Sequence, residues 1–208
     1  MSPQMGIVTD ADLAAAIVAH AADLDAHTRN YLQTLRTGEY YWPDMPGAST
    51  QGLTANFLCA SPLIVARDIT VDRIAIDVTT ADAGKVARLG IYNLGVNLAP
   101  GTLLLDAGVV SLNAVGVQAL VINQALPKGI YFPTLVCDSN AALLAATDIP
   151  YRISSRFLGL NPTDFQKGNG WWTVAQAYGV LPDPFTAGAA LSGALKLPVI
   201  AVRVLSLD

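Results

Sequence analysis

Five consecutive blocks between Ile69 and Cys137 decide the fold of this chain. They read ITVDRIAIDVTT (69–80), VARLGIYNL (86–94), TLLLDAGVVSL (102–112), VGVQALVINQAL (115–126) and PKGIYFPTLVC (127–137). Each block is rich in Val, Ile, Leu, Tyr and Thr and is bounded by Gly, Pro, Asn or Asp, which is typical of β-strands separated by turns. None has the length and the 3.6-residue period of an amphipathic helix. The stretch therefore predicts an antiparallel β-sandwich of the jelly-roll type.

The turn residues give the expected positions of the connections. They predict loops at 81–84, 95–101, 106–108, 112–116 and 127–129. This spacing favours a sandwich or jelly roll over alternating strands and helices. In the first block the apolar residues change phase at Asp72 and Arg73, which predicts a β-bulge or a corner between sheets. The last block, LPVIAVRVLSLD (197–208), predicts a strand that closes the sheet.

A helix is predicted before the sandwich, from an N-cap at Asp10 to about Arg36. Its apolar residues follow a heptad period, with histidines at the companion positions of the same seam. The seam consists of Leu13, Ile17, His20, Leu24, His27, Tyr31 and Leu35. A stripe this thin does not stabilise an isolated helix in water, so we expect it to pack against copies of itself or against another protein.

The predicted elements divide the chain into three parts. Residues 1–37 form an N-terminal lead and a stalk or docking helix, 38–52 a connector, and 53–208 the β-sandwich domain. The connector contains Tyr40, Tyr41 and Trp42, which we expect to plug the joint between stalk and sandwich. The alternative for these rings is a platform that binds a ligand.

Composition limits the classes of partner. Hydrophobic residues make up 52% of the chain and charged residues only 13%, yet no apolar run is long enough to span a membrane. The apolar surplus predicts a homo-oligomer, because a single exposed copy would aggregate. The net charge is −4 and the basic residues are scattered, which argues against a nucleic-acid partner. The first residues lack the basic and apolar regions of a secretion signal, so we expect synthesis in a cytosol.

The sequence contains no recognisable catalytic motif. Both histidines lie in the predicted helix, which leaves the sandwich without a Ser/His or Cys/His pair. Asp164 is the only carboxylate that we consider a candidate for glycoside hydrolysis, since most other aspartates occur in turns. Cys59 and Cys137 are expected to be reduced thiols in the core, with a disulfide as the alternative. We therefore expect a non-enzymatic protein without a cofactor.

The two histidines of the seam have two interpretations. In a bundle of parallel helices His20 and His27 would meet their copies at the axis and form polar layers that set the register. The alternative is that the facing imidazoles bind a metal ion, or an anion when they are protonated.

A second candidate site follows from the run Gly-Asn-Gly-Trp-Trp at 168–172. Sugars stack on aromatic rings while their hydroxyl groups meet polar turn residues. The candidate glycan-binding residues are Asp164, Asn169, Trp171, Trp172 and Tyr178. The alternative is that these aromatic residues fill the core under a long loop or pack against a neighbouring subunit.

Two regions of the chain resemble known proteins. The helix text AHAADLDAHTRNYL (19–32), with His20, Asp23, His27 and Tyr31, resembles segments near the N-terminal or connecting parts of tailed-phage fibre and appendage proteins. The segments DRIAIDVTTADAGKVARLGIYNLG (72–95), APGTLLLDAGVVSL (99–112) and LPKGIYFPTLV (126–136) are similar to a β-sandwich domain that recurs in phage virion appendages. Together these similarities cover residues 17–137.

The resemblance implies a trimeric virion protein, such as a head fibre, spike or tail-tip adhesin. Its N-terminal part would dock on other capsid or tail proteins through a coiled-coil stalk, and its sandwich would bind a host-surface glycan. The alternative is a decoration or cement protein that stabilises the capsid or tail and binds no receptor. A glycan-degrading enzyme is a third and weaker alternative.

Overall fold

The computed structural model describes residues 35–42, 49–140, 142–147, 160–161, 164–168, 170–192 and 196–207. The chain divides into two compact units, Met1–Thr34 and Leu35–Asp208. The first unit lies outside the described residues, and with it lie both histidines and the predicted seam as far as Tyr31. Leu35 and Arg36 are described and are not helical. The predicted C-terminal end of the helix, at about Arg36, is therefore wrong.

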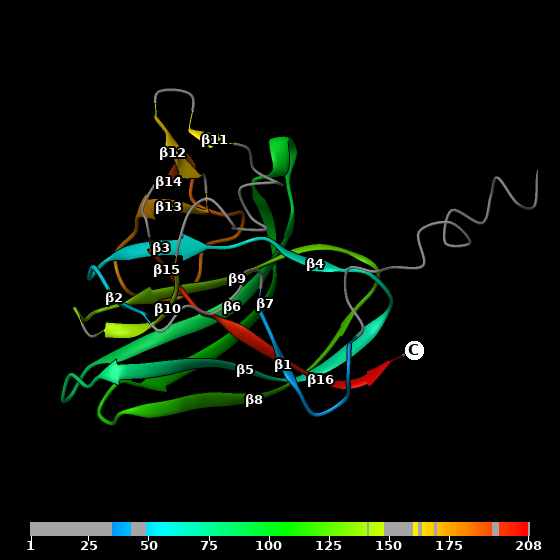
Figure 1. Cartoon of the computed structure of the whole chain (residues 1–208), viewed down its shortest axis with the longest axis horizontal. Coiled ribbons are helices and arrows are strands. Elements are labelled where there is room, and N and C mark those ends of the chain that lie inside the picture. Colours follow the sequence, from blue (N-terminus) through cyan, green and yellow to red (C-terminus); the bar gives the residue numbers. More distant parts are fainter. Residues whose placement is uncertain are drawn as a thin grey trace, which may run out of the picture. The chain divides into compact units, whose positions relative to one another are not determined.

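The second unit is mainly β and contains two antiparallel sheets of seven strands, here called sheet A and sheet B (Figure 1). Sheet A has the order β1 (Tyr40–Tyr41), β16 (Ala201–Leu207), β5 (Ile69–Thr80), β10 (Ala142–Thr147), β15 (Lys196–Pro198). In addition, β2 (Ser49–Gly52) pairs with β10, and β8 (Gly116–Leu126) pairs with β5. Because β1 and β2 belong to sheet A, part of the predicted connector is built into the sandwich.

Sheet B has the order β14 (Ala190–Ser192), β13 (Trp171–Ala175), β3 (Phe57–Ala60), β9 (Gly129–Cys137), β6 (Val86–Leu94), β7 (Pro100–Ser111). The strand β4 (Leu63–Val65) also pairs with β9, and the short 3-10 turn η1 (Val96–Leu98) connects β6 to β7. A separate two-stranded sheet is formed by β11 (Leu160–Asn161) and β12 (Asp164–Gly168).

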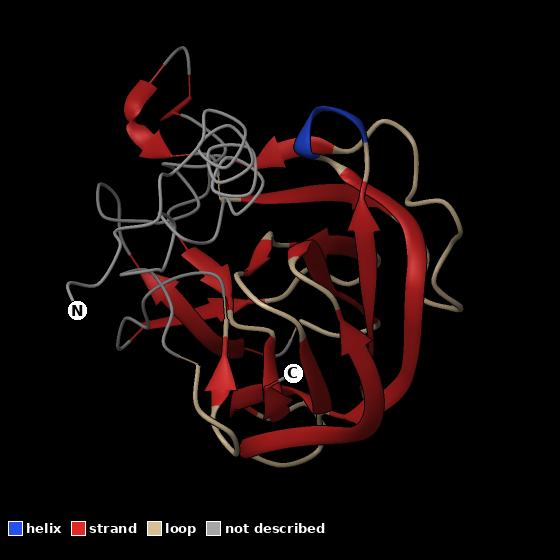
Figure 2. Ribbon diagram, turned by 90° about the vertical axis from the view of Figure 1, so that its right-hand side faces the viewer, coloured by secondary structure: helices blue, strands red, loops and turns tan. Residues whose placement is uncertain are grey.

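The main core lies between the two sheets, and the long strands curve around it (Figure 2). Side chains alternate across a regular strand, so every second residue of β6, and of β5 on each side of Asp72, points inward. Ile74 and Ile76 of sheet A and Leu89 and Ile91 of sheet B are all fully buried in this core. Leu35 is also buried there, so its side chain contributes to the sandwich and not to an external seam.

The predicted irregularity at Asp72 and Arg73 is confirmed. The register of β5 against β16 shifts at this point, because Arg203 pairs with Arg73 and the next residue, Val204, pairs with Val71. Asp72 is the extra residue of this bulge, which keeps apolar residues on the inner face on both sides of the shift.

The predicted loop at 106–108 is wrong, because β7 continues through it. The pairing of β7 with β6 shifts register between Asp106 and Gly108, so the turn-forming residues make a bulge and not a chain reversal. Gly108 has a φ of 100°, which only glycine adopts readily. The Asp106 carboxylate accepts a hydrogen bond from the Gly108 amide at 3.1 Å and pairs with Arg88 at 2.8 Å.

A second core covers the outer face of sheet B. The segment 176–189 crosses this face and buries Leu181 and Phe185 against Tyr92 and Phe132. The Phe185 ring meets the Tyr92 ring edge to face with centroids 5.0 Å apart, and the Tyr92 hydroxyl donates a hydrogen bond to the Pro182 carbonyl at 2.6 Å. The segment 176–189 is therefore packed as a cover on sheet B.

Candidate functional site

The two tryptophans of the candidate glycan site lie on opposite faces of sheet B. Both belong to β13, where Trp172 pairs with Ala60 and Thr173 with Cys59 of β3. Successive residues of a strand point to opposite sides. Trp171 accordingly packs against the core between the sheets, whereas Trp172 packs against the outer core. The pair therefore does not form one continuous aromatic platform.

Trp172 and Tyr178 are brought together by the structure. Both are partly buried and pack against the outer core of sheet B. The indole Nε1 of Trp172 donates a hydrogen bond to the Leu98 carbonyl at 2.9 Å, and the Tyr178 amide donates one to Asn56 Oδ1 at 2.9 Å. The first bond ties β13 to the turn after β6, and the second ties the covering segment to the turn before β3. Both contacts stabilise the fold, and each ring keeps a partly exposed surface.

The polar members of the candidate glycan site are not brought to these rings by the described contacts. Asp164 begins β12, which belongs to the separate two-stranded sheet. Asn169 lies outside the described residues.

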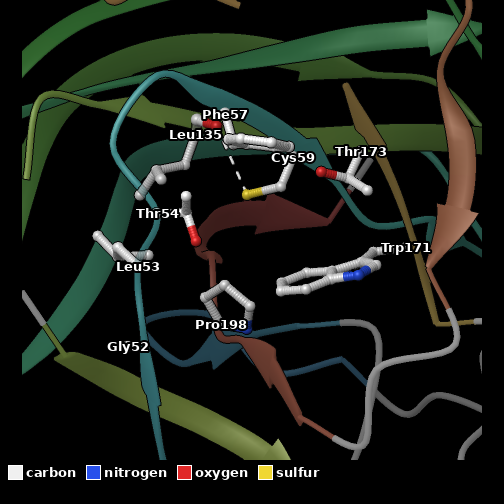
Figure 3. A pocket seen from close by; sticks show the side chains of 9 residues that line it. All are labelled: Gly52, Leu53, Thr54, Phe57, Cys59, Leu135, Trp171, Thr173 and Pro198. Atoms are coloured by element: carbon white, nitrogen blue, oxygen red, sulfur yellow. Dashed lines mark hydrogen bonds between the residues drawn. The ribbon is translucent and has the colours of Figure 1, made fainter. Parts of the chain in front are cut away.

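Trp171 lines a hollow of about 90 Å³ at the end of the inter-sheet core (Figure 3). The other lining residues are Gly52, Leu53, Thr54, Phe57, Cys59, Leu135, Thr173 and Pro198. Figure 3 shows the six-membered edge of the indole directed into this hollow and the ring nitrogen on its far side. That nitrogen is buried and has no hydrogen-bond acceptor among the described residues. The hollow holds little more than a few waters, which is small for a sugar.

A larger hollow of about 220 Å³ lies on the outer face of sheet A. Its floor includes Ala75, which pairs with Ala201 of β16 and Ala119 of β8. These residues alternate with inward-pointing residues such as Ile74, so they face away from the core. Tyr40 and Trp42 line the hollow as well. Its lining also includes Val117, Val199 and Asp77.

This hollow was not predicted from the sequence, although Tyr40 and Trp42 were expected to plug a joint or to bind a ligand. The hollow could have been predicted from the alternation of residues in β8. Leu120 and Ile122 pack against the core. The opposite face of the strand carries Val117, Ala119 and Val121. An outward-facing row without charge is unusual for a solvated strand and indicates a surface that is covered in use.

An ion-pair cluster borders the same face. Arg203 donates hydrogen bonds to both carboxylate oxygens of Asp72, with a distance of 2.9 Å from Nε to Oδ1. Arg73 lies 3.4 Å from the same carboxylate. The hydrogen bonds from Arg203 hold the pKa of Asp72 below its ordinary value. Because Asp72 is the bulged residue of β5, this cluster stabilises the local backbone.

No group of three His, Cys, Asp or Glu side chains in the described part of the chain is close enough to hold a metal ion. Cys59 and Cys137 are buried and unpaired, as predicted. Burial, and next the neighbouring Cys137, raises the pKa of the Cys59 thiol to about 12, which keeps it protonated and unreactive.

Within the described part of the chain no helix is long and apolar enough to cross a membrane. A scan against models of protein families finds no match, and no curated protein is significantly similar in sequence.

Proposed function

We propose that the protein is a non-enzymatic component of a phage virion and that its β-sandwich acts by contact with other protein surfaces. The observation that carries this proposal is the uncharged, outward-facing row of β8, together with the apolar hollow beside it. Val121 is 74% exposed and Val117 is 62% exposed. Apolar surface of this kind on a sheet face marks an interaction site. The decoration or cement role therefore fits the described geometry best.

The finer architecture that we propose is a jelly-roll-like sandwich carried by a trimeric N-terminal coiled coil. The N-terminal unit would dock on capsid or tail proteins, and the sandwich would extend the contact between subunits. The resemblance of the helix and of residues 72–136 to phage appendage proteins supports this arrangement. The low share of charged residues, 13%, supports burial of surface between copies.

Binding of a host-surface glycan is the second candidate. It is favoured by the grouping of Trp172 and Tyr178 on the outside of sheet B, where both rings remain partly exposed. A sugar would stack on either ring by its apolar face. In this role the protein would be a head fibre, spike or tail-tip adhesin.

Mass spectrometry of gradient-purified particles from the natural lysate tests the proposal. A virion component should be present at a fixed ratio to the major capsid protein and should stay bound through high-salt washing. A chain found only in the soluble fraction would contradict the proposal. Glycan-array and whole-cell binding by the purified full chain then separates the two candidates, because a decoration protein binds particles and neither cells nor sugars.

A further inference from the structure

We propose that β8 pairs edge to edge with β8 of a second copy, antiparallel, with the two-fold axis at Val121. Among the described strands β8 pairs only with β5, so no described strand occupies its other edge. In Figure 1 β8 lies at the border of sheet A, next to β5. Such an edge is a ready template for another strand.

The edge of β8 lacks three of the features that protect strand edges in soluble proteins, namely charge, proline and short length. It has one irregularity, where Val121 to Gln124 are opposed by Val71 to Arg73 of β5. It is 11 residues long, and the sequence contains no charged residue from Ala107 to Pro127. Proline is also absent from the strand itself. Charges, prolines, short length and bulges normally keep an edge from pairing.

The other long edge of the sandwich shows the contrast. The strand β7 ends sheet B and begins at Pro100, and its middle carries the charged Asp106. Its pairing with β6 shifts register three times. The β7 edge therefore has a charge, a proline and three register shifts, whereas the β8 edge has one register shift and neither charge nor proline. This difference favours a partner that covers the β8 edge in the functional state.

The sequence of β8 is complementary to itself when the two strands are centred on Val121. On the outer face Val121 then lies opposite its own copy, Ala119 opposite Asn123, and Val117 opposite Ala125. On the inner face Leu120 meets Ile122, and Gln118 meets Gln124, whose amides have matching donors and acceptors. These pairs are read from the strand GVQALVINQAL at 116–126. Each pair occurs twice around the axis except the central one, and no like charges face each other.

The geometry of β8 suits this register. Exposure alternates along it without interruption from Gly116 to Ala125, although its register against β5 shifts once between Val71 and Arg73. Centring on Val121 overlaps all 11 residues and joins the two copies of sheet A into one continuous sheet. A partner of unrelated sequence would have side chains complementary to the β8 row only by chance. A second copy of β8 has them by symmetry, so we propose a second copy as the occupant.

The pairing is independent of the virion role and of the N-terminal unit. If that unit forms trimers, β8 pairs would join two trimers; without trimers, they would produce dimers. The β8 pairing can therefore be absent in a virion protein, and it can be present in a protein that is not part of a virion.

The test is cysteine cross-linking of the full chain under mild oxidation. Directly opposed residues of antiparallel strands have Cα atoms about 4.5–5.5 Å apart, within the roughly 4.4–6.8 Å that a disulfide needs. Val121→Cys should therefore give a covalent dimer on non-reducing gels. Val117→Cys lies on the same face of the same strand but about 27 Å from its own copy, and it should remain uncross-linked.

A mixture of V117C and A125C chains completes the experiment, because these two positions are opposed in the proposed register. The mixture should cross-link while each variant alone does not. Wild-type protein under the same oxidant gives the background from Cys59 and Cys137, and circular dichroism confirms that each variant is folded. No dimer with folded V121C, or equal dimer with V117C, would overturn the proposal.

Discussion

Trp171 and Trp172 are adjacent in the chain, yet their indoles belong to the two different cores on either side of sheet B. This relationship follows from their position on a strand, and it gives the two residues separate roles. Trp171 closes one end of the inter-sheet core, whereas Trp172 packs against the outer core and ties β13 to the turn after β6.

Replacement of Trp172 should lower stability. W172A removes a large side chain from the outer core and should reduce the free energy of unfolding by about 3 kcal/mol. W172F keeps much of the packing and loses the hydrogen bond to the Leu98 carbonyl, so its cost should be about 1 kcal/mol. Urea unfolding measures both values. Unchanged stability of W172A combined with lost glycan binding would instead favour a sugar platform.

Gly90 of β6 should not tolerate a larger residue. A Cβ atom there would lie 2.2 Å from Leu181 Cδ1 and 2.6 Å from the Leu105 carbonyl oxygen. The Leu105 backbone is held in the sheet, so G90A should cost about 1–3 kcal/mol through overpacking. The expected result is a lower urea midpoint and faster proteolysis of the segment 176–189 that Leu181 anchors.

Gly52 provides the matched control for Gly90. It also lies in a strand, but nothing approaches a Cβ at that position within 4 Å. G52A should leave the urea midpoint unchanged within error. Equal midpoints for G90A and G52A would contradict the close approach of Leu181 to sheet B.

The Asp72–Arg203 pair should make stability depend on acidic pH. The pKa of Asp72 is lower in the folded state than in the unfolded chain, so its contribution is complete above the unfolded pKa of about 4. That contribution should be lost as the pH falls from there through the lower native pKa. D72N should flatten this part of the curve of unfolding free energy against pH. If the unfolding free energies of D72N and wild type changed in parallel below pH 4, protonation of Asp72 would not be linked to folding, which would contradict this prediction.

The two thiols should be inert in the folded protein. Burial raises the pKa of Cys59 to about 12 and also raises that of Cys137. A colourimetric thiol reagent at pH 8 should label neither residue until the protein is unfolded in urea. Because the unfolded thiol ionises near pH 9 and the buried Cys59 only near 12, stability should fall as the pH rises between these values. Rapid labelling without denaturant would contradict the buried placement.

The sandwich could be predicted from the sequence because strand alternation and turn residues are local signals. The blocks 69–80, 86–94 and 115–126 contain strands at nearly the predicted bounds, and the change of phase at Asp72 located a real bulge. The prediction failed at 106–108, where Asp and Gly mark a bulge as readily as a turn. Local sequence does not distinguish the two, since the outcome depends on the neighbouring strand β6.

The candidate sites were harder to predict because they depend on pairing between distant strands. Trp171 and Trp172 looked like one aromatic surface until β13 placed them on different faces. The hollow beside Ala75 needs β5, β8 and β16 in register, and no single segment reveals it. The sequence of β8 showed two alternating sets of residues. It did not show which set faces solvent, because both sets contain apolar residues.

The mass of the purified full chain in solution tests the central claim, which is that this protein functions by assembly. Light scattering and native mass spectrometry should show multiples of the 21.8 kDa chain, with V121K shifting the distribution toward smaller species and V180K leaving it unchanged. Val180 is a fair control because it is 71% exposed and belongs to the segment 176–189 that covers sheet B, whereas β8 belongs to sheet A. A stable 21.8 kDa monomer at all concentrations would contradict the account.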